Sequence, residues 1–302
     1  MNGTQNGTVW ADGGLRAWEE LSVPLMSDAV VRSAVVFDGM RADLTVDGQI
    51  RLLAGAAHVR RLVRSARSLR LPLAFDVDEI LRASALVARA ELTATGKRVA
   101  YVRPMALGAS LTELAGPVSL TIAAFAQDQQ ASEPLRLQVS SLRRPAADSL
   151  PPQVKAVANY QLSRLARLQA HAVGYDDALL LNAYGRLAES AGAAVLVERD
   201  GWVLTPPAWE GSLPSITIDI LERIARAIAV PFAREPVELT TVWSAHGLAL
   251  AGTLADVIDV GAVDDLDVSP GKTIAVLREA YLAALAGGAC EDLMQFEQFH
   301  EP

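Results

Sequence analysis

The sequence contains a single cysteine, Cys290, among 302 residues. One thiol cannot form a disulfide within the chain, so a disulfide framework is excluded and a cytoplasmic location is expected. Histidine is also sparse, and none of the four histidines belongs to a Cys/His cluster. Because zinc sites draw their ligands from such clusters, no metal site is expected. The four residues are His58, His171, His246 and His300.

The sequence also lacks long apolar runs and an excess of positive charge. No apolar stretch approaches the length of a membrane-spanning helix, so no membrane association is expected. The net charge is −8, whereas a protein that binds nucleic acid needs a basic face. Hydrophobic residues still make up 51% of the chain, which is enough for a sizeable core. The two "NGT" triplets in the first eight residues predict a flexible polar tail, because no signal peptide precedes them.

Lysine is rare as well, with three lysines against 24 arginines. Lys97 in "TATGKRVA" and Lys272 in "VSPGKTIA" lie in turn-like segments, whereas Lys155 in "PPQVKAVANY" lies between apolar and small residues. Arginine stays protonated at any accessible pH, but a desolvated lysine can lose its proton and become a nucleophile. This window alone is also consistent with an ordinary surface lysine.

Hydrophobic periodicity predicts a mixture of short strands and amphipathic helices. In the first half it predicts strands over 9–18, 33–55, 98–107 and 118–126, and helices over 56–73 and 76–93, the second opened by Asp76 or Asp78. In the second half it predicts a strand from 135, helices over 159–174, 215–229 and 269–288, and several short strands between the first two of these helices.

The chain is therefore expected to have an α+β fold with two domains. The polar segment 127–134, "QDQQASEP", breaks the pattern and predicts a linker between an N-terminal domain, 1–126, and a C-terminal domain, 135–302. No glycine-rich nucleotide-binding motif and no internal repeat occurs.

Seven short motifs occur in a particular order along the chain. They are "HVRRL" (58–62), "YVRP" (101–104), "VSSLRRPAADSLPPQVKAVANY" (139–160), "GYDDALLLNAYGRLAESAGAAVLV" (174–197), "LTPP" (204–207), "SLPSITIDIL" (212–221) and "AGTLADV" (251–257). This series resembles the class IV, fold-type IV pyridoxal-phosphate enzymes, and most closely the branched-chain amino acid aminotransferases, from about residue 9 to about residue 285. The resemblance implies a smaller N-terminal α/β domain and a larger C-terminal domain around a barrel-like sheet, which binds the cofactor.

The resemblance assigns Lys155 as the amine that forms a Schiff base with pyridoxal 5'-phosphate and then carries a proton during the reaction. Glu189, in "YGRLAES", takes the family position of the carboxylate that keeps the pyridine nitrogen protonated. Tyr160 is expected to bind the phenolic oxygen of the cofactor, and Leu213 to pack on its ring. Leu213 is equally consistent with plain core packing.

The phosphate of the cofactor is a dianion and needs fixed donors. The resemblance places Ile216 and Thr217 at a helix N-terminus, where free N–H groups and the helix dipole favour an anion. Thr253 is expected to add a hydroxyl and an amide. Arg61 is expected to add charge-assisted hydrogen bonds, because the family spacing H-x-x-R-L selects it over Arg60.

Substrate contacts follow from the same resemblance. The α-carboxylate is expected at the backbone amides of residues 253–255, which include Leu254 and Ala255, and at Tyr101 and Arg103 of "YVRP". Both strand residues are also consistent with purely structural roles.

Four positions depart from the family pattern. Arg32 stands where the family usually has a tyrosine, five residues before the "FDG" of this chain. Pointing inward, Arg32 would pair with a substrate carboxylate; pointing outward, it would be a surface charge. Ser215 and Ile218 replace a glycine and an arginine of the phosphate-binding turn, and Ala194 replaces an asparagine. These changes leave the amino-acid specificity open.

The expected function is transamination between an amino acid, of branched-chain type, and a 2-oxo acid such as 2-oxoglutarate. The alternatives are a D-amino-acid or (R)-amine transaminase or an aminodeoxychorismate-lyase-like enzyme on the same scaffold, since the reaction is decided by the pocket and not by the fold. A non-catalytic relative would not need Arg61, Lys155 and Glu189 together. The resemblance also implies a homodimer.

Overall fold

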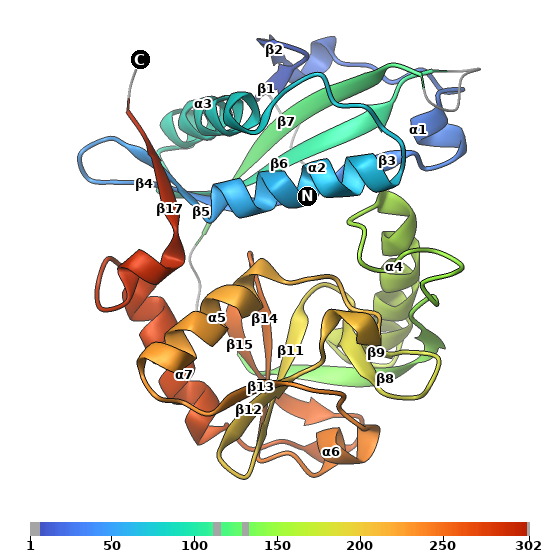
Figure 1. Ribbon diagram of the computed structural model, residues 1–302, viewed down its shortest axis with the longest axis vertical. Helices are drawn as coiled ribbons and strands as arrows, with labels where there is room; N and C mark the ends of the chain where they lie inside the picture. Colours follow the sequence, from blue (N-terminus) through green and yellow to red (C-terminus); the bar gives the residue numbers. More distant parts are fainter. Residues whose placement is uncertain (1–6, 111–115, 129–132, 301–302) are drawn as a thin grey trace. The chain divides into compact units, whose positions relative to one another are not determined.

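The computed structural model describes residues 7–110, 116–128 and 133–300, and the chain forms two compact units (Figure 1). The first unit comprises Met1–Gln130, Val154–Ala158 and Gln295–Pro302, and the second comprises Ala131–Gln153 and Asn159–Met294. Among the described residues, none of the helices combines the length and the apolar character that crossing a bilayer requires.

The two units differ from the expected domains in two short segments. The main boundary, between residues 130 and 131, falls within the expected linker 127–134, of which 129–132 lie outside the described residues. Val154–Ala158 and Gln295–Pro302, which were expected in the C-terminal domain, belong to the first unit. The rare lysine of "PPQVKAVANY" is therefore part of the first unit, although the chain on either side of this segment belongs to the second.

An antiparallel eight-stranded sheet forms the centre of the first unit. Its strand order is β17-β5-β4-β6-β7-β1-β2, with β3 also paired to β6. The strands are β1 (Thr8–Ala11), β2 (Gly14–Ala17), β3 (Val35–Phe37), β4 (Met40–Leu44), β5 (Ile50–Leu53), β6 (Val99–Gly108), β7 (Val118–Gln127) and β17 (Phe296–Phe299). The C-terminal strand β17 thus lies next to β5, far from it in sequence.

Two amphipathic helices pack on this sheet, α2 (Gly55–Ser68) and α3 (Val77–Thr95). The apolar spacing that predicts α2 is confirmed, because Val59, Leu62 and Ala66 enter the core and contribute to one cluster with both helices and the sheet. The helix ends earlier than the sequence suggests, at Ser68 instead of residue 73. The chain turns at Arg70, whose φ is +58°, and Pro72 cannot continue a helix. A short helix, α1 (Asp28–Val31), and a 3₁₀ turn, η1 (Trp18–Glu20), complete the unit.

A mixed nine-stranded sheet forms the centre of the second unit, in the order β10-β9-β8-β15-β14-β11-β12-β13, with β16 paired to β15. The strand β8 pairs in parallel with β9 and β15, and β12 with β13. The strands are β8 (Leu135–Arg143), β9 (Asp177–Leu181), β10 (Leu187–Ser190), β11 (Ala194–Arg199), β12 (Trp202–Thr205), β13 (Phe232–Arg234), β14 (Gly247–Gly252), β15 (Asp256–Val263) and β16 (Leu266–Asp267).

Four helices accompany the second sheet. They are α4 (Val157–Ala172), whose first two residues belong to the first unit, α5 (Ile216–Ala227), α6 (Leu239–Trp243) and α7 (Lys272–Leu285), with the 3₁₀ turns η2 (Ala208–Glu210) and η3 (Glu291–Met294). The core consists of strand residues such as Leu137, Leu179, Val197 and Leu250. The buried carboxylate of Glu198 accepts hydrogen bonds from the first amides of α7 and so anchors that helix to β11.

The structure decides which aspartate begins α3. Asp76 is the N-cap: its carboxylate accepts a hydrogen bond from the Glu79 N–H at 2.8 Å, and the Glu79 carboxylate accepts one from the Asp76 N–H at 2.7 Å. This reciprocal pair is a capping box. Asp78 lies exposed in the first turn and only adds negative charge near the positive end of the helix.

We therefore expect Asp76→Ala to destabilise the protein by about 1 kcal/mol, and Asp78→Ala by only a few tenths of that. The two variants remove the same charge from the same turn, so their difference isolates the hydrogen bond. The urea midpoints of unfolding measure it. Equal midpoints for the two variants would contradict the assignment of Asp76 as the cap.

Candidate functional site

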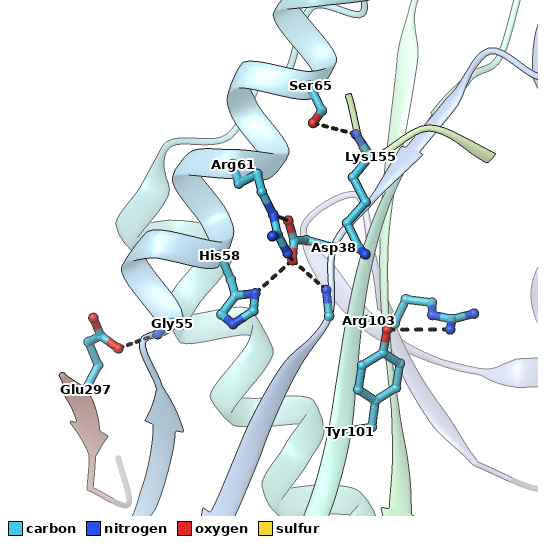
Figure 2. Close-up of polar contacts among 10 residues, drawn as sticks. Asp38, Gly55, His58, Arg61, Ser65, Tyr101, Arg103, Lys155 and Glu297 are labelled. Atoms are coloured by element: carbon cyan, nitrogen blue, oxygen red, sulfur yellow. Dashed lines mark hydrogen bonds and ion pairs between the residues drawn. The ribbon is translucent and has the colours of Figure 1, made fainter. Parts of the chain in front are cut away.

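A buried carboxylate, Asp38, organises the polar residues of the first unit (Figure 2). Asp38 directly follows β3 and is completely buried. The Arg61 guanidinium binds it with two bonds of 2.8 Å, one from Nε and one from Nη2, and His58 Nδ1 lies 2.8 Å from Oδ1. The backbone N–H of Gly39 donates a fourth bond, at 2.7 Å. Four residues, two from "FDG" and two from "HVRRL", are thus joined in one cluster.

Burial and pairing act in opposite directions on this cluster. Burial alone would raise the pKa of Asp38, but the charge and hydrogen bonds of Arg61 and the His58 contact outweigh it, so the pKa of Asp38 is far below its usual value. Burial holds the pKa of His58 below its usual value, despite the neighbouring carboxylate. The histidine is therefore neutral near pH 7 and donates to ionised Asp38 from Nδ1.

Lys155 is held through its backbone by two elements of the same unit. Its N–H donates to the Ser65 hydroxyl of α2 at 3.2 Å, and its carbonyl accepts from the Phe37 N–H of β3 at 3.1 Å. Val36 and Ala156 form an additional β-bridge. The Lys155 amine lies over the Phe37 ring, 5.1 Å from its centroid. The half-buried lysine is thus fixed at its base, with its amine against an aromatic face.

Tyr101 and Arg103 lie on one face of β6, as alternate residues of a strand do. The Arg103 guanidinium lies over the Tyr101 ring at 5.1 Å and over the Phe37 ring at 5.2 Å, so Phe37 receives a cation from Lys155 and from Arg103. A Cβ on Gly39 would lie 2.0 Å from the Tyr101 hydroxyl, which explains why glycine follows Asp38. Within the described part of the chain, the buried Arg103 Nε has no hydrogen-bond partner.

Arg32 has a partner of its own, Asp28. It ends α1 and forms an ion pair with the buried Asp28 one turn earlier, while just over half of its side chain is exposed. The first unit therefore links Arg61 and Lys155 through α2 and β3, and Lys155 to Arg103 through Phe37. It gives Arg32 a separate partner.

Glu189 is the central acidic residue of the predicted set in the second unit. The register of β10 shifts between Leu187 and Glu189, and such a bulge re-aims a side chain. The Glu189 carboxylate accepts from the Leu213 N–H at 3.0 Å and lies 3.1 Å from the Nε of Arg144, a buried arginine. The structure thus brings Glu189 and Leu213 together through the backbone.

The remaining predicted residues lie at a helix start, in a turn and on α4. Ser215 is the N-cap of α5 and accepts from the Ile218 N–H at 3.3 Å, so the serine that replaces the family glycine has a local role. Ile216 and Thr217 are the first two helical residues, and both are buried. Their N–H groups cannot have acceptors within the helix. Residues 253–255 form the turn between β14 and β15, and Tyr160 lies half-buried on α4.

Sequence reasoning missed Asp38, His58, Phe37 and Arg144 as parts of the site. His58 and Arg61 are three residues apart on a helix and so share one face, which the "HVRRL" motif already indicated. Nothing in the sequence marked Asp38 as their common partner, because the contact joins residues at least 20 positions apart.

The sequence profile of a family described as amino-transferase class IV matches residues 35–263. The branched-chain-amino-acid aminotransferase of Escherichia coli (strain K12) is 28% identical over 274 residues, 87% of either chain. The probable branched-chain-amino-acid aminotransferase of Aquifex aeolicus (strain VF5) is 26% identical over 277 residues, 89% of either chain.

Solved structures give the same result. The branched-chain aminotransferase of Thermoproteus uzoniensis with norvaline has a TM-score of 0.90 at 28% identity, over 97% of this chain and 99% of that one. The T.th. branched-chain amino acid aminotransferase with pyridoxamine 5'-phosphate has a TM-score of 0.89 at 29% identity, over 97% and 98%. The profile match spans well over half of the sequence, and the structural agreement extends over nearly all of it. This chain belongs to the class IV aminotransferases, has the fold-type IV architecture and is a transaminase.

Proposed function

We propose that the protein is a pyridoxal-phosphate-dependent aminotransferase that moves the amino group of a branched-chain amino acid to a 2-oxo acid such as 2-oxoglutarate. The observation that carries the proposal is the fixed position of Lys155. Both its backbone groups are bonded, to Ser65 and Phe37, and its amine lies over an aromatic ring. The names of the relatives support the choice of substrate.

The residues fit this cofactor on three counts. A reactive amine is available at Lys155, a fixed carboxylate at Glu189, and two buried residues begin α5 at its positive end. The Leu213 N–H and Arg144 hold the carboxylate in one orientation. When bound, the cofactor supplies an aldehyde that takes up the amino group and a pyridine ring that withdraws electrons.

Each residue then has a definite task. The amine of Lys155 would hold the cofactor through its aldehyde carbon and, when free, would act as the base that takes the proton from the substrate Cα. Glu189 pairs with the pyridine nitrogen, and its negative charge favours the protonated ring. Tyr160 donates to the phenolic oxygen, while Leu213 packs on the ring.

The phosphate is assigned to the amides of Ile216 and Thr217, to Thr253 and to Arg61. Arg61 already forms a two-bond ion pair with Asp38. Such a pair fixes the plane and position of the guanidinium, so its role at the phosphate is that of an oriented donor and not of an isolated charge.

The substrate α-carboxylate is assigned to the turn amides of 253–255 and to Arg103, with Tyr101 beside it. Arg103 suits this task because two aromatic rings stack against its guanidinium while its buried Nε lacks a partner among the described residues. A donor left unpaired inside a protein favours an acceptor from a ligand. Two copies of the chain in a cytoplasmic homodimer remain part of the proposal.

Lys155→Ala is expected to abolish transamination, because it removes the amine that would bind the aldehyde. It should also abolish the covalent attachment of the cofactor that borohydride reduction of the Schiff base produces. Activity with L-leucine and 2-oxoglutarate, and mass spectrometry of borohydride-treated protein, measure the two effects. Lys97→Ala is the matched control, since Lys97 is a partly exposed lysine paired with Asp128. Unchanged turnover in Lys155→Ala would refute the proposed function.

A panel of amino donors tests the substrate class. With 2-oxoglutarate as acceptor, we expect L-leucine, L-isoleucine and L-valine to react, and D-leucine and an aryl (R)-amine to fail. Reaction of the last two would instead identify a D-amino-acid or (R)-amine transaminase. Release of pyruvate from aminodeoxychorismate without an acceptor would identify a lyase.

The panel tests Arg32 when glutamate is added as donor with a branched-chain 2-oxo acid as acceptor, because glutamate and 2-oxoglutarate give no net reaction. If its guanidinium binds a substrate carboxylate, Arg32→Tyr lowers kcat/KM for glutamate about tenfold, because a charge-assisted hydrogen bond is lost. The variant raises kcat/KM for leucine, whose side chain has no carboxylate to bind. Arg32→Lys, which keeps the charge, should fall between the two proteins. Coinciding profiles for wild type and Arg32→Tyr would show that the pair with Asp28 is the whole role of this arginine.

A further inference from the structure

The C-terminal strand β17 is firmly attached to the sheet of the first unit. Its four residues pair with β5, from Phe296 opposite Leu53 to Phe299 opposite Ile50. The Arg51 guanidinium lies 4.1 Å from the centroid of the Phe296 ring, and Arg89 donates to the Phe299 carbonyl at 3.2 Å. The strand is therefore an integral part of this unit, although it is contributed by the last residues of the chain.

Glu297 of this strand reaches the N-terminus of α2 (Figure 2). Its carboxylate accepts hydrogen bonds from the Gly55 N–H at 2.6 Å and from the Ala56 N–H at 3.1 Å. The residue before the helix, Ala54, has a left-handed backbone with φ +46° and offers no capping side chain, and the first turn contains no acidic residue. Glu297 thus supplies the cap that the local sequence lacks, from 241 positions away.

The contact is partly shielded from water. Burial raises the pKa of Glu297, although the bonds from Gly55 and Ala56 act in the opposite direction. A carboxylate in such a place interacts with the helix dipole more strongly than one at the surface.

The helix that Glu297 caps carries three residues of the site. His58 lies in the first turn, with its backbone N–H bonded to the Ala54 carbonyl, and both His58 and Arg61 bind Asp38. Ser65, two turns further, accepts from the Lys155 N–H. If the start of α2 loosens, the positions of His58 and then of Arg61 are the first in the site to change, because these residues lie nearest that end of the helix.

We propose that Glu297 is a positioning residue of the cofactor site, which holds the first turns of α2 so that His58 and Arg61 keep their geometry on Asp38 and Arg61 is oriented for the phosphate. The inference rests on the proposed role of Arg61 toward the cofactor. Glu297 acts through the helix and not by contact with the cofactor or the substrate.

Glu297→Ala is compared with Asp76→Ala, which removes the side-chain cap of α3, a helix of the same unit that carries no predicted site residue. In the cofactor-free protein, hydrogen exchange should accelerate at residues 55–61 in Glu297→Ala and at the start of α3 in Asp76→Ala. Acceleration spread equally over both helices in Glu297→Ala would overturn the inference, because the cap would then act on the unit as a whole.

The dissociation constant of pyridoxal 5'-phosphate supplies the second readout. Glu297→Ala is expected to raise it about threefold to tenfold, the scale of a lost helix cap, while Asp76→Ala stays within about twofold of wild type. Glu297→Gln should give an intermediate value, since its amide oxygen still accepts one N–H. If Glu297→Ala does not fold, Glu297→Gln replaces it in the comparison with Asp76→Ala and wild type.

Arg61→Ala separates this inference from the proposed function. If wild type binds the cofactor, Arg61→Ala weakens binding and Glu297→Ala behaves like Asp76→Ala, the inference alone is wrong. If wild type takes up no cofactor, or Arg61→Ala binds it as tightly as wild type, the assigned role of Arg61 fails and the inference falls with it.

Discussion

The ion pair between Asp38 and Arg61 is the interaction on which the first unit's contribution to the site depends. A carboxylate without any exposure is costly unless it is fully paired, and here Arg61, His58 and the Gly39 N–H provide four bonds. That requirement fixes α2 against the end of β3. The same two elements hold the backbone of Lys155, so the pair that neutralises a buried charge also fixes the base of the side chain proposed to react.

The division of labour between arginine and lysine follows from their chemistry. Arg61, Arg103 and Arg144 each hold a planar group against a carboxylate or an aromatic ring, and a guanidinium is suited to this because it stays charged and bonds in a fixed plane. The reaction needs an amine that can give up its proton, which arginine cannot provide. In a chain with 24 arginines and three lysines, the proposed reactive position is one of the few that carry a lysine.

The sequence predicted the α+β class, the main helices and the identity of the family, because periodic segments and ordered motifs are local in the chain. It did not predict the helices α1 and α6 or the strands β13 to β17. Most of these are too short for a hydrophobic period to register, but β14 and β15, with six and eight residues, were missed as well. It proposed Lys155 and Arg61 but not Asp38 or Glu297, whose roles arise from contacts between distant residues. It left Asp76 and Asp78 equal, and a reciprocal hydrogen bond to Glu79 decided between them.

The location of Lys155 shows why the contacts between distant residues, which the sequence did not predict, matter for the proposed chemistry. The five residues Val154–Ala158 belong to the first unit, whereas the residues before and after them belong to the second. Val154 and Ala156 are buried in the core of the first unit, and Ala156 forms a β-bridge with Val36. Apolar side chains on either side of the lysine thus anchor the segment, while the lysine itself points its amine over Phe37. Within this segment the Ala156 N–H donates to the Val154 carbonyl at 2.9 Å, so Lys155 lies at the centre of a three-residue turn between its two buried neighbours. The sequence V-K-A therefore determines the orientation of the lysine, because burial of Val154 and Ala156 directs the Lys155 amine away from the core and over Phe37.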